Sequence, residues 1–168
     1  MDDKQTQFLQ RIDENKGILF KICKIYEDNE EDRDDLLQEM VLQLWVAYDS
    51  FRGESKFSSW MYRVALNTAI VFFKKQKRRP DNVALSYDME QPDELSGPNE
   101  KEEQLAIFYK AVKHLSKVEK ALIFLYMEDR PYNEIAAHLG ITELNMRVRL
   151  NRVKNKLKDI IKAMNYEY

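Results

Sequence analysis

The chain has 168 residues, 44% of them hydrophobic and 11% aromatic, which is enough apolar material for one core or two small ones. Its formal net charge of -2 does not by itself indicate nucleic-acid binding, and its single cysteine, Cys23, excludes a disulfide within the chain. The chain has only 4 glycines and 4 prolines, and this scarcity favours an all-α fold. No apolar run approaches the roughly 20 residues that span a bilayer, and the N-terminus lacks a basic signal-peptide region. We therefore expect an all-α cytoplasmic protein.

The small net charge hides strongly charged segments. Residues 27–39 hold eight acids and one base, residues 74–79 hold five bases and no acid, and residues 81–103 hold eight acids and one base. A basic segment is therefore flanked by two acidic ones, and the average charge conceals a possible nucleic-acid surface.

The first block, residues 1–79, contains apolar residues at the spacing of amphipathic helices. The earlier set is Leu37, Val41, Leu44, Tyr48 and Phe51, and the later set is Phe57, Trp60, Val64, Asn67 and Val71. We predict helices that are buried along these two stripes, without strands. Cys23 ends an apolar run that starts at residue 18, so we expect it to be a buried small hydrophobe.

Residues 80–100 have the composition of a linker. They combine many acids with few large apolar residues and include Pro80, Pro92, Gly97 and Pro98. A flexible segment of this length spans about 25 Å as a coil and at most about 70 Å when extended. We therefore expect two helical domains, residues 1–79 and 101–168, that can be placed independently.

The second block contains two local motifs that begin or end helices. Ser116 and Glu119 have the spacing of a capping box ahead of the apolar run 121–126. Residues 131–143 read PYNEIAAHLGITE, which is typical of a helix-turn-helix. Gly140 falls where the first helix must end in left-handed backbone angles, and Thr142 offers an N-cap hydroxyl to the next helix.

The helix that follows is amphipathic and basic. Its apolar stripe is Met146, Leu150, Val153, Leu157 and Ile160. Its other surfaces carry Arg147, Arg149, Arg152, Lys154, Lys156 and Lys158, with no acid between residues 144 and 158. This concentrated positive field makes DNA the leading partner.

Two stretches together resemble bacterial extracytoplasmic-function (ECF) sigma factors, in a style similar to members from Bacteroidetes. Residues 34–39, DDLLQE, and residues 51–69, FRGESKFSSWMYRVALNTA, look like the family's second conserved region. Residues 115–122, LSKVEKAL, together with residues 132–158 look like its fourth region. The resemblance covers nearly the whole chain apart from the linker, in the family's order and spacing.

This resemblance implies a non-catalytic subunit that binds core RNA polymerase, recognises two promoter elements and opens the downstream one. The implied partners are core RNA polymerase, double-stranded and melted promoter DNA, and an anti-sigma factor, either free or membrane-bound. No small-molecule substrate, cofactor or metal is expected.

Asp35, Gln38 and Glu39 are expected to be exposed acceptors for the polymerase. The alternative is that this acidic run is simply a solvated helix N-terminus favoured by the macrodipole.

The resemblance also assigns a surface for the minus-ten element. The implied contacts are Arg52, Gly53, Glu54, Ser55, Lys56, Tyr62, Arg63, Asn67, Lys74, Lys75, Lys77 and Arg78. The loop 52–56 resembles the family's specificity loop, which catches a flipped base. Aromatic faces can stack unpaired bases, and Tyr62 is expected to point outward, whereas Phe57 and Trp60 also fit the core. Asn67 matches a base-reading position, but it could instead be a buried helix amide.

The helix-turn-helix is expected to read the minus-thirty-five element. The face away from the apolar stripe carries Arg147, Val148, Asn151 and Arg152. An arginine can hydrogen-bond to guanine, an asparagine can hydrogen-bond to adenine, and a valine can contact the methyl group of thymine. Lys156 lies farther along the helix and is expected to contact phosphates.

A free-standing helix-turn-helix repressor or activator is the alternative function. It would need a sensor or dimerisation domain in the first block, and such a domain has no use for the acidic, aromatic and basic pattern of residues 34–79. Enzyme functions are weakly supported because the chain has no glycine-rich phosphate loop and no HExxH or CxxC motif, and His114 and His138 stand alone.

Overall fold

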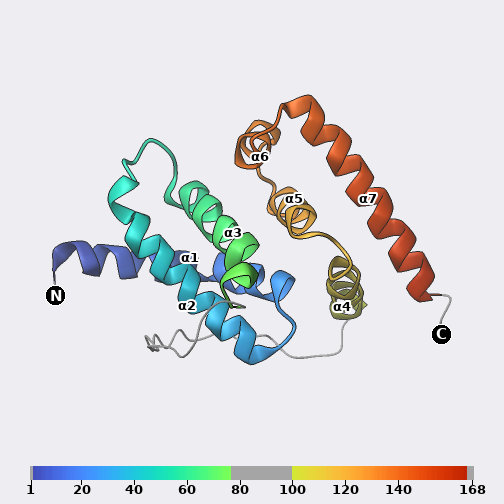
Figure 1. The fold of residues 1–168 in the computed structure, drawn as a ribbon, viewed down its shortest axis with the longest axis horizontal. Coiled ribbons are helices and arrows are strands. Elements are labelled where there is room, and N and C mark those ends of the chain that lie inside the picture. Colours follow the sequence, from blue (N-terminus) through green and yellow to red (C-terminus); the bar gives the residue numbers. More distant parts are fainter. Residues whose placement is uncertain (1, 77–99, 166–168) are drawn as a thin grey trace. The chain divides into compact units, whose positions relative to one another are not determined.

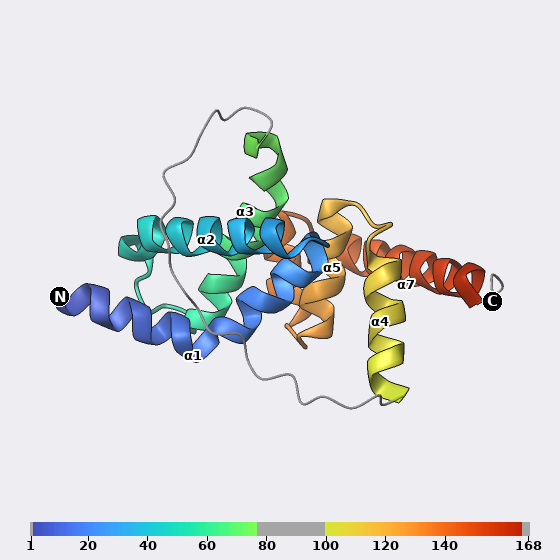
Figure 2. The same ribbon diagram turned by 90° about the horizontal axis from the view of Figure 1, so that it is seen from below.

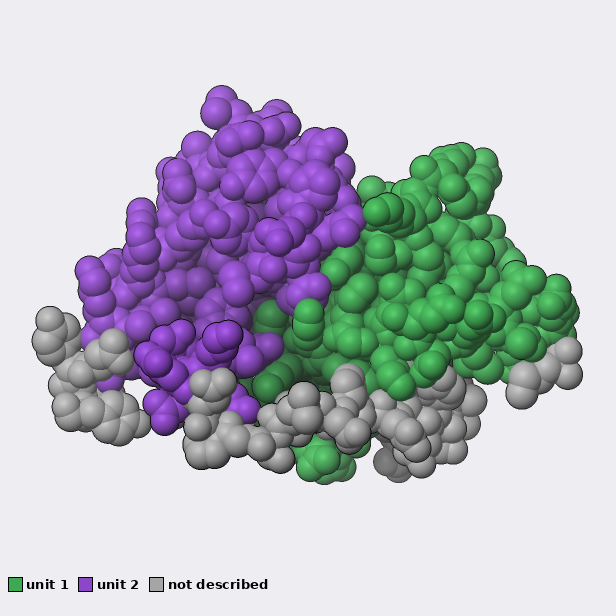
Figure 3. All heavy atoms as spheres, turned by 180° about the vertical axis from the view of Figure 1, so that it is seen from behind, with its two compact units in different colours: residues 1–94 green, residues 95–168 purple. Residues whose placement is uncertain are grey.

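The computed structural model describes residues 2–76 and 100–165, with the backbone alone for residues 73–76 and 165. These residues form seven α-helices and one short 3-10 helix and include no strand, which confirms the all-α expectation (Figure 1). The chain divides into two compact units, residues 1–94 and 95–168 (Figure 3). No helix in the described ranges has the length and apolar character needed to cross a membrane.

Unit 1 contains α1 (Asp3–Tyr26), α2 (Glu30–Ala47), the 3-10 helix η1 (Tyr48–Ser50) and α3 (Phe57–Gln76). Each of the three long helices packs against the other two (Figure 2). The Asn29 side chain caps α2 by accepting a hydrogen bond from the Glu31 N–H at 2.8 Å. Acids in the first turn of α2 also favour the helix because they face the positive end of its dipole.

The core of unit 1 is built from the facing sides of these helices. Its fully buried large side chains are Ile12, Leu19, Ile22, Leu36, Met40, Leu44, Met61 and Leu66. Cys23 is also buried, as expected, and burial raises the pKa of its thiol to about 12. A thiol with such a raised pKa stays protonated at neutral pH, so Cys23 acts as a small core residue rather than a nucleophile.

Unit 2 contains α4 (Glu100–Val112), α5 (Lys117–Met127), α6 (Tyr132–Leu139) and α7 (Glu143–Asn165). The predicted capping box is present: the Glu119 N–H donates to Ser116 Oγ at 3.2 Å, and the Ser116 N–H donates to Glu119 Oε2 at 2.8 Å. Gly140 ends α6 with φ +64°, a left-handed conformation that favours glycine. Thr142 then caps α7 by accepting from the Asn145 N–H at 3.2 Å.

The long helix α7 packs against α4, α5 and α6 along the predicted apolar stripe. Met146, Leu150, Val153 and Leu157 are buried, and Ile160 is half-buried. Leu122, Leu125 and Ile135 supply large buried side chains from the two preceding helices. Packing on one stripe leaves the rest of the circumference of α7 at the surface.

Candidate functional site

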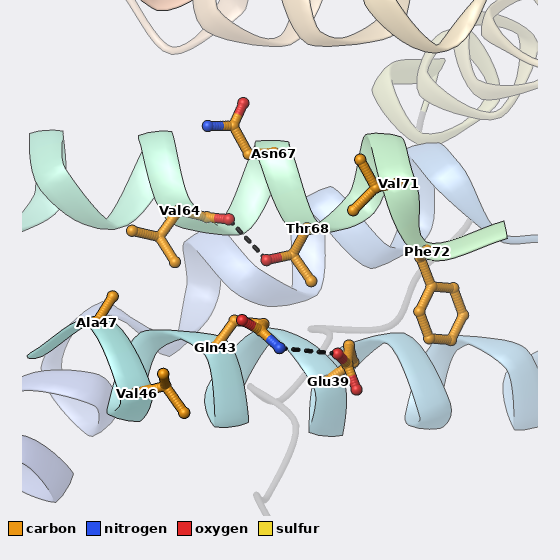
Figure 4. Close-up of a pocket in the computed structure, with 9 residues that line it drawn as sticks. All are labelled: Glu39, Gln43, Val46, Ala47, Val64, Asn67, Thr68, Val71 and Phe72. Atoms are coloured by element: carbon orange, nitrogen blue, oxygen red, sulfur yellow. Dashed lines mark hydrogen bonds between the residues drawn. The ribbon is translucent and has the colours of Figure 1, made fainter. Parts of the chain in front are cut away.

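The three predicted polymerase contacts on α2 differ in exposure. Asp35 is exposed and Gln38 is half-buried, but Glu39 is only 8% exposed. The expectation that Glu39 is exposed is therefore wrong. Because α2 packs against both α1 and α3, its buried face is wide enough to include Glu39 beside the apolar stripe. The Glu39 carboxylate accepts a hydrogen bond from Gln43 Nε2 at 3.0 Å (Figure 4).

A groove of about 320 Å³ runs between α2 and α3. It is lined by Glu39, Gln43, Val46, Ala47, Val64, Asn67, Thr68, Val71 and Phe72 (Figure 4). Thr68 is satisfied locally, because its hydroxyl donates to the Val64 carbonyl at 2.8 Å. Val46 and Val71 are 67% and 42% exposed, so the groove combines apolar rims with polar groups from α2.

Asn67 stands at the exposed side of α3. Its amide points away from α2 in Figure 4, and the residue is exposed. The alternative of a buried helix amide is therefore wrong. An exposed amide can donate and accept hydrogen bonds at once, as base reading requires.

Tyr62 is only 4% exposed, so the expectation that it points outward is wrong. The buried face of α3 is formed by Met61, Tyr62, Ala65, Leu66, Ala69 and Phe72. The stripe expected from the sequence, which begins at Phe57 and Trp60, is instead half-buried in its first half and exposed at Val71. α3 is apolar around most of its circumference and packs on two helices, so periodicity alone did not identify the side that is buried.

The loop 52–56 is exposed at all five positions, and Gly53 adopts φ +73°. The residues at its two ends, Phe51 and Phe57, belong to an aromatic cluster that also contains Phe8, Trp45, Tyr48 and Trp60. The Phe57 and Trp60 ring centroids are 5.3 Å apart, and those of Phe51 and Trp60 are 5.4 Å apart. Such contacts stabilise the cluster beyond its burial of apolar area. The loop is thus an exposed segment whose two ends belong to a packed aromatic cluster.

The predicted basic contacts of the first block are only partly described. Arg63 is exposed on α3, and Lys74 and Lys75 belong to the last turns of that helix. Lys77 and Arg78 lie outside the described residues.

All four predicted reading residues of α7 are exposed. Arg147, Val148, Asn151 and Arg152 lie away from the buried stripe, and Val148 is 43% exposed. Leu144, in the first turn of the same helix, is 73% exposed and adds a second apolar side chain to this surface. The face therefore offers cationic, amide and apolar groups, which is the chemistry needed to contact base edges in a major groove.

Three cations of α7 have partners within unit 2. Arg147 forms an ion pair with Glu143 at 3.0 Å, and its Cζ lies 4.6 Å from the centroid of the Tyr132 ring. Lys154 Nζ lies 3.9 Å from the centroid of the Tyr126 ring. Lys156, the predicted phosphate contact, forms an ion pair with Glu119 Oε2 at 3.0 Å. These contacts orient the three side chains, and α7 as a whole keeps a net positive charge.

A second cavity, of about 350 Å³, separates the first turn of α5 from α7. It is lined by Ser116, Val118, Glu119, Leu122, Leu139, Arg149, Arg152 and Val153. Two arginines and the carboxylate of Glu119 therefore line the cavity at the start of α5. In the described parts of the chain, no three His, Cys, Asp or Glu side chains are grouped so that they could hold a metal ion.

Some contacts of the site were missed by the sequence analysis. The ion pair between Glu143 and Arg147 could have been predicted from the sequence, because an acid four residues before a base lies on the same helix face. The Lys156 to Glu119 pair joins residues 37 positions apart, and no local pattern indicates it. The aromatic cluster likewise brings Phe8 of α1 against Trp45 of α2 and Tyr48 of η1.

Comparison with known proteins matches both halves of the chain to one family. Residues 11–79 match Sigma-70 region 2, and residues 105–157 match Sigma-70, region 4. The ECF RNA polymerase sigma-E factor of Escherichia coli is 30% identical over 143 residues, covering 76% of this chain and 75% of that protein. The ECF RNA polymerase sigma factor SigG of Mycobacterium tuberculosis is 23% identical over 184 residues, and the match covers 95% of this chain. The chain spans about half the length of SigG, with 50% of that protein covered.

Two solved structures share the fold. The sigma factor RpoE of Bartonella quintana, solved in complex with the anti-sigma factor NepR, matches with a TM-score of 0.69 and 22% identity over 93% of this chain and 97% of that one. CnrH, solved in complex with the cytosolic domain of CnrY, matches with a TM-score of 0.65 and 21% identity over 95% of this chain and 90% of that one. With the sigma-E identity and the two regions in order, these findings show that the chain belongs to the family of ECF RNA polymerase sigma factors.

Proposed function

We propose that this protein directs promoter-specific transcription initiation as a sigma subunit of RNA polymerase. The observation that carries the proposal is the presence of both Sigma-70 regions, in order, on one chain. A free-standing helix-turn-helix regulator would account for the second region and leave the first without a role. The subunit is non-catalytic: it binds, reads and opens DNA while the polymerase performs the chemistry.

The proposed division of labour follows the two regions. Residues 1–79 bind core polymerase and the minus-ten element, residues 80–100 are a linker, and residues 101–168 bind the minus-thirty-five element. Asp35 is exposed and Gln38 is half-buried, so both remain accessible as polymerase contacts. Exposure also supports the loop 52–56 with Arg63 and Asn67 as DNA contacts. The buried side chains of Glu39 and Tyr62 leave both residues out of this set.

We also propose an anti-sigma factor as a regulatory partner. One structural relative, RpoE, was solved in complex with the anti-sigma factor NepR. Another, CnrH, was solved in complex with the cytosolic domain of CnrY. We place this chain in the cytoplasm, where a sigma subunit meets RNA polymerase.

The polymerase contact can be tested by changing the two accessible residues of α2 that are proposed to form it. Asp35→Arg combined with Gln38→Ala should weaken binding of the full chain to core RNA polymerase by about tenfold or more, because it places a charge opposite to the one the partner recognises. Competition for labelled core enzyme measures the affinity, and circular dichroism monitors the fold.

Glu14→Arg is the matched control, because Glu14 is an exposed acid of the same unit on α1. The control should assemble like the wild type. If the α2 variant also formed the holoenzyme normally while the wild type supported promoter-specific transcription, the assigned polymerase contact would be incorrect. If the wild type did not bind core polymerase at all, the proposed function itself would fail.

A further inference from the structure

The loop 52–56 begins and ends at two phenylalanines that are in contact. Phe51 precedes the loop and Phe57 is the first residue of α3. Their ring centroids are 5.5 Å apart with an interplanar angle of 86°, an edge-to-face arrangement. The five exposed residues between them therefore form a short loop closed at its base by these rings.

Arg11 of α1 lies against both of these rings. Its Cζ is 5.2 Å from the centroid of Phe51 and 5.5 Å from that of Phe57. Both distances lie within the range over which a guanidinium is attracted to an aromatic ring. Among the residues that the structure describes, no carboxylate forms an ion pair with this guanidinium, and its side-chain contacts are with the two rings.

The position of Arg11 is set by the core and not by the loop. The next residue, Ile12, is fully buried, and Phe8 on the preceding turn is 2% exposed. The Phe8 ring contacts both Trp45 and Tyr48 at centroid distances of 5.1 Å. A helix anchored on both sides of Arg11 fixes the backbone of this residue, so its side chain reaches the two rings from a constant point on α1.

Arginine suits this place better than other side chains. Its guanidinium is planar and delocalised, so it can stack on aromatic faces, whereas the ammonium of lysine is a compact and strongly hydrated point charge. A neutral apolar side chain would keep the packing against the rings but lose the electrostatic attraction.

We propose that Arg11 is a positioning residue for the loop 52–56. By holding Phe51 and Phe57 together from α1, it fixes the geometry in which the loop meets an unpaired base of the minus-ten element. This inference rests on the proposed function of the loop, since Arg11 acts on DNA only through it.

The test measures base preference with the full chain assembled on core RNA polymerase. A promoter library randomised in the minus-ten and minus-thirty-five elements is selected for open-complex formation. Arg11→Met keeps an unbranched side chain against the rings and removes the charge. We expect it to lower the preference for the favoured minus-ten base by about five- to twentyfold, the combined effect of two cation–π contacts, and to leave the minus-thirty-five preference unchanged.

Two further variants separate positioning from general stability. Arg11→Lys retains the charge and should restore part of the preference. Lys4→Gln is the matched control, because Lys4 Nζ lies 5.0 Å from the centroid of the Trp45 ring in the same aromatic cluster but away from the ends of the loop. It should preserve the wild-type preference in both elements. Backbone order parameters of the free chain from NMR relaxation should fall in the loop of Arg11→Met and stay unchanged in that of Lys4→Gln.

Each outcome has a defined meaning. Retention of the minus-ten preference in Arg11→Met would overturn the inference, as would equal losses in Arg11→Met and Lys4→Gln or equal losses in both promoter elements. Partial rescue by lysine, with a loss confined to the minus-ten element, would support it. A wild-type protein without any preference in the minus-ten element would instead refute the proposed function of the loop.

Discussion

The cations of α7 are held in different ways, and this affects how each can contact DNA. Arg147 is oriented by Glu143, the first residue of α7, and by the ring of Tyr132, the first residue of α6. Arg152 faces the cavity beside the first turn of α5 and has no ion pair among the described residues. Lys156 is paired with Glu119 and must share or exchange this partner to contact a phosphate. The side chains therefore differ in both direction and availability.

Alanine substitutions should separate base-reading residues from phosphate contacts. Arg147→Ala and Arg152→Ala should each cost about 1 to 3 kcal/mol at the minus-thirty-five element and relax preference at one base position. Lys156→Ala should weaken binding almost equally on all sequences and reduce the salt-dependence slope by at most about one unit. A promoter library assayed with core polymerase at two salt concentrations measures both effects.

The converse pattern would contradict this orientation of α7. In that case Lys156→Ala would change base preference, and the two arginine variants would only lower the affinity for every sequence. The dependence of affinity on salt concentration is a second criterion. Its slope should fall when a phosphate contact is removed, irrespective of promoter sequence.

At the scale of elements, one carboxylate links the start of α5 to α7. Glu119 accepts from the Ser116 N–H at 2.8 Å and from Lys156 Nζ at 3.0 Å. Partial burial by itself raises the pKa of Glu119, but these hydrogen bonds and the charge of Lys156 outweigh it, so the pKa lies below its ordinary value of 4.5. The charged form is thus favoured by the folded state.

This link makes the stability of unit 2 depend on pH. Because the folded-state pKa is lowered, the contribution of Glu119 is fully present above the ordinary value of 4.5 and is lost as the pH falls through the lower folded-state pKa. We therefore expect Glu119→Gln to be less stable than the wild type at neutral pH and equally stable at strongly acidic pH. Urea unfolding followed by circular dichroism measures the difference.

The two tryptophans provide an internal control for this experiment. Trp45 and Trp60 both belong to helices of unit 1, so tryptophan fluorescence follows unit 1 alone. The fluorescence transition should be the same in the wild type and in Glu119→Gln. A stability difference that persisted unchanged at acidic pH would show that the charge of Glu119 is not its source.

At the scale of the whole molecule, acidic and basic surfaces share one chain of net charge -2. The first turns of α2 and α4 are acidic, whereas α7 is strongly basic. We expect acidic segments of the free protein to compete with DNA phosphates for the basic ones and so to lower its affinity for DNA. If core polymerase binds through Asp35 and Gln38 as proposed, it would occupy part of the acidic surface and reduce that competition.

The free protein should accordingly bind promoter DNA weakly. We expect a dissociation constant no tighter than about 1 μM at physiological salt, in the range of non-specific binding, and much tighter binding once core polymerase is added. Fluorescence anisotropy with a labelled promoter fragment checks this at fixed salt. Nanomolar, sequence-specific binding by the free chain would rule out the masking effect.

The sequence by itself determined those features that depend on residues close together in the chain. Ser116 with Glu119, Gly140 and Thr142 each act within one helical turn, and all three appear as expected. The stripe of α7 was also identified correctly, because polar residues bound it on both sides and left a single choice of buried face. The same local patterns carried the family resemblance, which the comparisons confirmed.

Only the tertiary structure decided which side of a helix is buried when several sides are suitable. Tyr62 and Glu39 were both expected at the surface, yet each belongs to a helix that packs against two others. Tertiary packing also brought Arg11 to Phe51 and Phe57, and Lys156 to Glu119. Such contacts depend on how helices meet in space, and spacing along the chain carries no information on them.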